Sequence, residues 1–160
     1  MSSTRQYQPF QADEIRLLTL DEGEKTSEIT CSLQHVKLEE EIQYHALSYV
    51  WGDPRNTNTI RVDGTTWHIW SHLYTALQHI LLVDEPLVVW IDALCIDQND
   101  VNEKTKQVMM MRRIYQGAKE VRAWLGVESD DSDTVMDFIM RDNYPDLGNP
   151  FSYMPYKPDN

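Results

Sequence analysis

Several features that would assign a protein class at once are scarce in this chain of 160 residues. It has two cysteines, Cys31 and Cys95, which are too few for the disulfide framework of a small secreted domain. The first residues lack the basic and apolar segments of a secretory signal. The longest apolar candidate is interrupted by Asp84-Glu85-Pro86, so no run reaches the length of a membrane span. We therefore expect a cytoplasmic protein with reduced thiols and no membrane span.

Basic residues are also in short supply. There are 14 Lys and Arg against 26 Asp and Glu, which makes the formal net charge −12. A duplex-binding surface needs clustered cations to neutralise phosphates, so we expect no nucleic-acid partner. Neither glycine-rich phosphate pattern, GxGxxG or GxxxxGK[ST], occurs. Four basic residues fall on one predicted helix, and we interpret them as its solvated face: Lys104, Lys106, Arg112 and Arg113.

The hydrophobic pattern is that of a globular α/β domain. Strands are predicted at residues 14–20, 29–38, 44–51, 87–92 and 120–125, and helices at 71–82, 101–117 and 132–141. A second hairpin is predicted around Asp63-Gly64, between strands at 59–62 and 66–69. The alternation after residue 44 predicts a parallel central sheet flanked by helices, with an N-terminal β-hairpin and a small inserted hairpin.

This pattern predicts one domain at residues 1–142 and a proline-rich extension or linker at 143–160. In the helix at 101–117 we expect the buried stripe to be formed by Val108, Met111, Ile114 and Tyr115.

The most informative segment is LVVWIDALCIDQ at residues 87–98, where a buried strand leads into polar groups and then a helix start. Ligands of open α/β sheets bind beyond the carboxyl ends of the strands, beside helix N-termini. If the strands at 44–51 and 87–92 are parallel, their ends share one edge of the sheet. The candidate site residues at that edge, with two from the following helix, are Ser48, Trp51, Gly52, Asp53, Asp92, Cys95, Gln98, Glu103 and Gln107.

Most of these residues also have a structural interpretation. Asp100-x-x-Glu103 fits a capping box, in which the glutamate bonds a backbone amide. Asp92 can bond loop amides, and Trp51 can be a core aromatic. Cys95 is either a buried inert thiol or a nucleophile. We expect no metal site, because the histidines on the helix at 71–82 have no third ligand beside them.

Three segments together resemble the fungal heterokaryon incompatibility (HET) domain family. They are IRLL at residues 15–18, YHALSYVWGDP at 44–54, and WIDALCIDQND at 90–100 with its continuation to Gly126. Their order and spacing match from about residue 7 to about residue 128. One departure is Asp97, where the family usually has Asn, and it adds a negative charge to this loop.

The resemblance implies a fungal protein that triggers growth arrest or cell death in non-self recognition, often as the first domain of a longer chain. HET domains are thought to be distantly similar to TIR domains, which implies a flavodoxin/TIR-like sheet. Some TIR domains hydrolyse NAD through a helix glutamate after self-association. By that analogy Glu103 is the predicted catalytic residue, the other candidates bind NAD as a substrate, and no cofactor is needed.

Two further hypotheses stay open. The domain can instead be a non-enzymatic module that self-associates into a cell-death complex, with the acidic residues 128–133 as a contact surface. Alternatively, Cys95 is a nucleophile. In each case we expect a homo-oligomer on activation, and an upstream sensor or a fused regulatory domain as the activator.

Overall fold

The computed structural model describes residues 7–21, 28–39, 41–81, 87–126 and 151–153. The predicted helix at 132–141, the acidic segment 128–133 and most of the predicted extension at 143–160 lie outside these ranges. Eight strands of the described ranges form one sheet in the order β5-β4-β2-β1-β6-β3-β7-β8. The strands are β1 (Glu14–Leu20), β2 (Thr30–Lys37), β3 (His45–Tyr49), β4 (Thr57–Val62), β5 (Thr65–Trp70), β6 (Leu87–Ile91), β7 (Glu120–Trp124) and β8 (Phe151–Tyr153).

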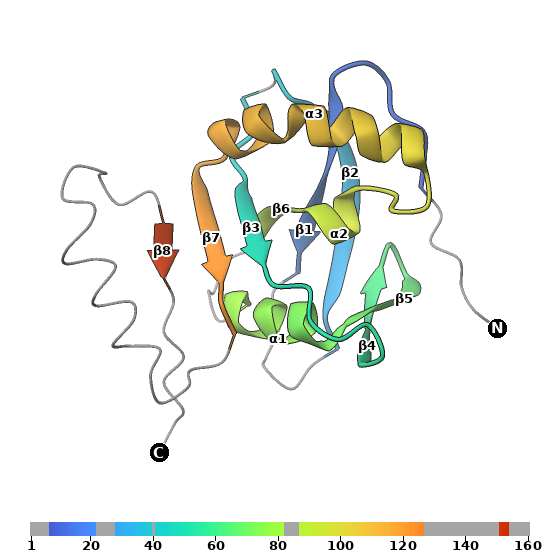
Figure 1. Cartoon of the computed structure of the whole chain (residues 1–160), viewed down its shortest axis with the longest axis vertical. Helices are drawn as coiled ribbons and strands as arrows, with labels where there is room; N and C mark the ends of the chain where they lie inside the picture. Colours follow the sequence, from blue (N-terminus) through green and yellow to red (C-terminus); the bar gives the residue numbers. More distant parts are fainter. Residues whose placement is uncertain (1–6, 22–27, 40, 82–86, 127–150, 154–160) are drawn as a thin grey trace.

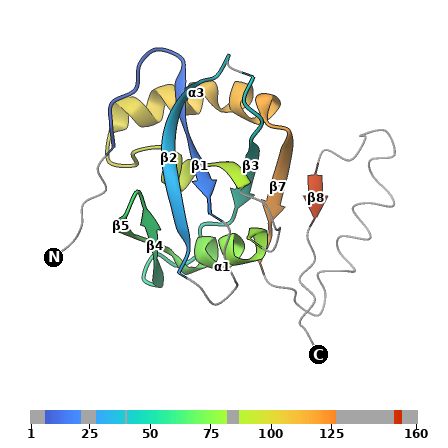
Figure 2. The same ribbon diagram turned by 180° about the vertical axis from the view of Figure 1, so that it is seen from behind.

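Within the described residues, three helices accompany the sheet: α1 (Ser71–Ile80), α2 (Asp92–Cys95) and α3 (Val101–Gly117). In Figure 1, α3 crosses the top of the view and α1 crosses the bottom, with the strands running between them. From behind, β2 spans the height between these helices, and the β4–β5 hairpin lies beside its lower part (Figure 2). In the described ranges, no helix is both long enough and apolar enough to cross a membrane.

The prediction of an α/β sheet flanked by helices is confirmed, but the sheet is mixed. Strands β6, β3, β7 and β8 are parallel neighbours, as the alternation predicts. The N-terminal hairpin forms as expected, with β1 antiparallel to β2. However, β1 also pairs antiparallel with β6, so it occupies the middle of the sheet. Four consecutive residues of β1, Ile15 to Leu18, are buried because strands on both sides and layers on both faces enclose them.

The small hairpin is confirmed, and it extends the sheet. Asp63 and Gly64 have φ angles of 49° and 74°, which is the left-handed pair that a tight type I′ turn requires. Because β4 pairs in parallel with β2, the hairpin extends the sheet beyond β2, on the side that faces away from β1.

The helix α3 begins where predicted, since the Asp100 carboxylate accepts hydrogen bonds from the amides of Asn102 and Glu103. Its buried side differs from the expected stripe. Ile114 is fully buried, but Val108 is 52% exposed, so the prediction for Val108 is wrong. A polar residue, Gln107, is buried instead. The short helix α2 was not predicted, because four residues are too few to show a helical period.

Candidate functional site

A pocket of about 380 Å³ opens where β3 and β6 end. Its lining comes from the N-terminal segment, the end of β3, the β5–α1 junction and the loop between α2 and α3. The residues that line it are Tyr7, Tyr49, Trp51, Ile69, Trp70, Leu73, Ala93, Asp97, Gln98 and Asn99. Its volume falls in the range of small-molecule sites, and it lies where open α/β sheets bind ligands.

Aromatic rings make up much of the pocket wall. The rings of Trp51 and Trp70 are 4.6 Å apart between centroids and are tilted by 54°. Tyr7 packs edge-on against Trp67, with 5.3 Å between ring centroids. The hydroxyl of Tyr7 donates to the carbonyl oxygen of Leu94 over 3.1 Å, which ties the N-terminal segment to α2. The walls therefore come from segments far apart in the chain.

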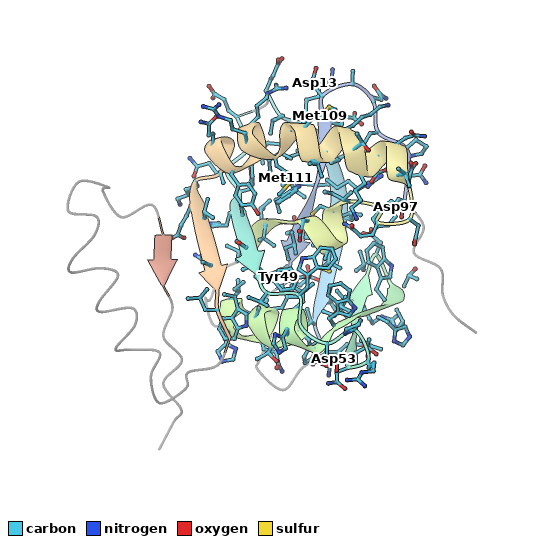
Figure 3. All side chains as sticks on the ribbon, viewed as in Figure 1. Asp13, Tyr49, Asp53, Asp97, Met109 and Met111 are labelled. Carbon is cyan, nitrogen blue, oxygen red and sulfur yellow. The ribbon has the colours of Figure 1, made fainter. Side chains whose placement is uncertain are left out.

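Two carboxylates give the pocket its charge. Asp97, which is labelled in Figure 3, lines the pocket directly and lies on the loop before α3. Asp92 lies behind the wall, beside Trp51, and its carboxylate accepts a hydrogen bond of 2.7 Å from the amide of Ala93. Burial raises the pKa of Asp92, and the Ala93 amide, the Trp51 indole and the more distant charge of Lys104 oppose that rise only in part.

The loop that carries Asp97 is held from below by a buried ion pair. Glu103 Oε1 accepts a hydrogen bond of 2.6 Å from the amide of Asp97. Both Glu103 oxygens also bind Arg16, with Nη1–Oε1 of 2.6 Å and Nη2–Oε2 of 3.0 Å. Arg16 Nη1 donates in addition to the carbonyl oxygen of Cys95 over 3.0 Å. Glu103 therefore positions the pocket loop, and its carboxylate is already engaged by the protein.

Arg16 uses its whole guanidinium group in this arrangement. Besides the three contacts above, Nη2 donates to the carbonyl oxygen of Gln8 over 2.6 Å, and Nε donates to His35 Nε2 over 3.2 Å. All five N–H groups of the guanidinium are thereby bonded. The rings of Tyr7 and Phe10 contact it, with centroids 4.5 and 3.9 Å from Cζ. Arg16 is fully buried, and it joins the N-terminal segment to β1, β2, α2 and α3.

Comparisons with known proteins identify the family. The family model described as Heterokaryon incompatibility protein (HET) matches residues 44–152. The chain belongs to the HET family. It is similar to "Heterokaryon incompatibility protein 6, OR allele" of Neurospora crassa, with 40% identity over 139 residues. The alignment covers 78% of this chain and 20% of that protein, so the chain spans about a fifth of its relative's length. No solved structure gives a significant match.

In this HET domain, only some of the predicted site residues lie at the pocket. Trp51 and Gln98 line the pocket, and Asp92 adjoins it through Trp51. Glu103 and Gln107 do share one face of α3, as their spacing predicts, but that face meets β1. Gln107 is buried and donates its amide to the carbonyl oxygen of Glu14 over 2.9 Å. The capping box is only half formed, because Glu103 reaches the amide of Asp97 rather than that of Asp100.

The structure contradicts a nucleophilic or substrate-binding Cys95. The thiol is fully buried and accepts a contact of 3.3 Å from the amide of Ile91. Burial raises its pKa to about 12, so it is a neutral thiol without access to a substrate. It is a packing residue of the HET core.

The remaining three candidates lie on β3 or just after it, outside the pocket lining. Ser48 is exposed on β3, opposite Ala123 of β7. Gly52 provides a positive φ of 74°, at a point where a Cβ would lie 2.7 Å from His72 Cγ. Asp53 forms an exposed ion pair of 2.6 Å with Arg55, at the bottom edge of the view in Figure 3.

Sequence reasoning missed most of the pocket's aromatic wall. Tyr7 lies in a segment that has no periodic pattern, and Trp70 directly follows the predicted inserted hairpin, whose place in the sheet the sequence does not indicate. The clustering of aromatic residues at 67–70 was the available signal. In the ranges that the structure describes, no three His, Cys, Asp or Glu side chains are grouped so that they could hold a metal ion.

Proposed function

We propose that the chain is the HET-domain part of a cytoplasmic effector of fungal non-self recognition and programmed cell death, which acts by hydrolysing NAD. Family membership and the printed name of the Neurospora crassa relative support the biological role. The observation that carries the chemical role is the aromatic and acidic pocket at the ends of β3 and β6. An upstream sensor or a fused regulatory domain would activate it, because the relative is about five times longer than the matched region.

The order of the parallel strands supports the analogy with TIR domains. Numbered along the chain, the parallel strands β3, β6, β7 and β8 are the first to the fourth, and they lie in the order second, first, third, fourth. That is the order of the corresponding strands in flavodoxin-like sheets. The analogy is one of fold, so it supports a test of NAD as substrate and assigns no residue.

The reaction requires little of the protein beyond charge and position. Hydrolysis breaks the bond between ribose and the cationic nicotinamide ring, and the electron pair stays on the ring nitrogen. Water then adds to the ribose carbon and loses a proton to solvent. The ribose is oxocarbenium-like in the transition state, and a nearby carboxylate stabilises that positive charge. No general acid is needed, because nicotinamide leaves as a neutral molecule.

The contacts support a division of labour among the carboxylates. Asp97 borders the pocket, so we propose it as the carboxylate that faces the cationic substrate, with Asp92 adding negative potential from behind Trp51. Glu103, the residue predicted as catalytic by analogy, touches Arg16 and the Asp97 amide. We propose that activity depends on Glu103 through the position of this loop.

The test is NAD consumption by concentrated protein, measured for the wild type and three variants, each with and without enforced dimerisation. Asp97→Asn should lower kcat with an unchanged melting temperature. Glu103→Gln should lower both activity and melting temperature, because it weakens a buried ion pair. Cys95→Ala should retain the wild-type rate per folded molecule. Absence of turnover in the dimerised wild type, with death activity retained in cells, would reject the enzymatic proposal.

One observation favours a second candidate function, a non-enzymatic module that self-associates into a cell-death complex. Three apolar side chains on α3 are exposed: Val101 (76%), Val108 (52%) and Met109 (78%). A helix packed on a sheet normally exposes polar residues there, and apolar exposure is typical of contact surfaces. We define these three residues as the α3 apolar face, and the proposed occupant is a second copy of the chain.

A further inference from the structure

The pocket combines aromatic rings with the carboxylate of Asp97, and among the residues that the structure describes no Lys or Arg side chain lines it. Anionic ligands, such as phosphates, are usually held by basic side chains or by the backbone amides of a glycine-rich loop. Cations are attracted to the faces of Trp and Tyr rings and to carboxylates, as in the aromatic cages that recognise quaternary ammonium groups. The composition of this pocket is therefore that of a cation site.

We propose that the pocket binds a flat cationic ring of the N-alkylpyridinium class, and that Asp97 sets its preference for the charged ring over a neutral one. This proposal adds a ligand class to the proposed function. It rests on that function only in naming the natural source of the ring, which would be the nicotinamide end of NAD. The phosphate-bearing remainder of such a molecule would extend out of the pocket.

The aromatic walls favour a flat, cationic ligand. Four of the ten lining residues are Tyr or Trp, and the Trp51 and Trp70 rings adjoin each other at 4.6 Å. The carboxylate of Asp92 lies beside the indole of Trp51, and its negative charge adds to the attraction of this wall for a cation. A flat ring suits this wall better than a round ammonium group because it can stack on an indole face.

The carboxylates favour a charged ligand. Within the described part of the chain, neither Asp92 nor Asp97 forms an ion pair with a Lys or Arg side chain. Asp97 Oδ1 accepts the amide of Asn99 over 3.0 Å, and its own amide is bound to Glu103, so the side chain is held at the pocket. An anion fixed beside an aromatic wall favours a charged ring over a neutral ring of equal size.

A carboxamide on the ring also has a partner of the right kind. Gln98 lines the pocket and donates its amide nitrogen to the carbonyl oxygen of Asp92 over 2.9 Å. That contact fixes the orientation of the side-chain amide, so Oε1 is the end that a ligand N–H would meet. The site therefore offers stacking, charge and an amide acceptor to one ligand.

The experiment compares three probes by titration calorimetry and tryptophan fluorescence: 1-methylnicotinamide, nicotinamide and choline. The first two differ by one methyl group and one positive charge, and choline has the charge without the flat ring. We expect 1-methylnicotinamide to bind at least about ten-fold more tightly than nicotinamide, and more tightly than choline. Equal affinity for nicotinamide would overturn the role of charge, and equal affinity for choline would overturn the flat-ring assignment.

Three variants locate the effect. Asp97→Asn should reduce the preference for the charged probe by about five-fold or more, with nicotinamide binding unchanged. Trp70→Leu should weaken the binding of both nicotinamide probes, because a side chain without a π-face replaces part of the aromatic wall. The matched control is Asp21→Asn, which removes the same charge at the end of β1, at the opposite edge of the sheet from the pocket. An equal effect of Asp21→Asn would reduce the preference to a property of net charge and reject the site.

The test of the cation site and the test of NAD hydrolysis can fail independently of each other. Selective binding of 1-methylnicotinamide without NAD consumption would reject the hydrolase and retain the cation site. NAD consumption without selective binding of the charged probe would reject the cation site and retain the hydrolase. Because Asp97→Asn can be checked for an unchanged melting temperature, a loss of selectivity is not confused with a loss of folding.

Discussion

Arg16 and Glu103, 87 residues apart in the chain, form a two-point ion pair in the interior of the domain. The side chain of Arg16 is 0% exposed and that of Glu103 is 9% exposed. The planar guanidinium matches the two carboxylate oxygens, which makes this the strongest geometry for such a pair. Because the same groups bind the carbonyl of Cys95 and the amide of Asp97, the pair connects β1 to the loop of the pocket.

Removal of the guanidinium should destabilise the whole domain. Arg16→Met keeps an unbranched side chain of similar length, but it leaves Glu103 buried without a counter-charge. Breaking one partner of a buried pair typically costs about 3–5 kcal/mol of unfolding free energy. Urea denaturation followed by tryptophan fluorescence measures this loss as a fall in the midpoint.

The chain contains a matched control for that prediction. Asp53 and Arg55 form an ion pair with the same 2.6 Å separation, but their side chains are 38% and 86% exposed. Arg55→Met should leave the urea midpoint unchanged, because solvent screens the pair. If the two substitutions shift the midpoint equally, burial is not what makes the Arg16 pair important.

Gly52 and Gly64 allow backbone strain to be separated from steric overlap. Both have a φ of 74°, but a Cβ would meet nothing within 4 Å at Gly64 and would lie 2.7 Å from His72 Cγ at Gly52. Gly64→Ala should therefore lower the unfolding free energy only by the cost of holding an alanine in the left-handed backbone conformation, about 1 kcal/mol. Gly52→Ala should cost more, as measured by thermal or urea denaturation.

The exposed side chain of His72 supplies the check on this explanation. In a background of His72→Ala, the additional cost of Gly52→Ala should disappear, and the two glycine substitutions should become similar. A cost that stays larger in this background would place its origin elsewhere.

The two thiols should make the domain sensitive to alkaline pH. Burial raises the pKa of Cys31 and of Cys95 to about 12 in the folded protein, whereas an unfolded thiol ionises near about 8.5. The folded state therefore binds more protons than the unfolded state between these values. The free energy of unfolding is unaffected below that window and falls as the pH rises through it.

Denaturation midpoints measured between pH 8 and pH 11 test this directly. The double variant Cys31→Ala/Cys95→Ala should show a smaller fall with pH, although its stability at pH 7 is lower because a small cavity remains. Some pH dependence should persist, since burial also raises the pKa of Tyr44 to about 12. An identical slope in the two proteins would contradict the assignment to the thiols.

The α3 apolar face predicts a specific defect in self-association. Val108→Glu places a charge in this face and should raise the protein concentration needed for a dimer, as measured by sedimentation velocity. Gln116→Glu adds the same charge at an exposed position near the end of α3 and should have no such effect. Retention of cell-death activity by a monomeric Val108→Glu protein would reject the self-association hypothesis.

Local patterns predicted the elements well and the sheet less well. The helix at 101–117, the Asp63-Gly64 hairpin and the parallel strands follow from periodicity and turn chemistry, which act over a few residues. Nothing local indicates that β1 inserts between β2 and β6, because strand order depends on pairing between distant segments. Val108 was predicted to be buried because its helical spacing places it on the same stripe as Ile114. Spacing alone does not show which side of the helix faces the sheet.

The same distinction applies to the candidate site. Trp51 and Gln98 line the pocket and Asp92 lies beside it, because the ends of adjacent parallel strands share an edge whatever else the sheet contains. The role of Glu103 depends on a partner 87 residues away, which no spacing rule can supply. Tyr7 was missed for the same reason, because it reaches the pocket from a segment that has no regular structure.

The central position of β1 has a practical consequence for anyone who expresses this domain. The family match starts at residue 44, but a fragment cut there would lack β1 and β2, the two strands that lie between β4 and β6 in the sheet. It would expose the edge of β6 to strand exchange with other molecules, and it would leave Glu103 without Arg16. The strands needed for folding therefore begin well before the start of the family model, and insolubility of such a fragment would reflect a missing centre rather than a missing end.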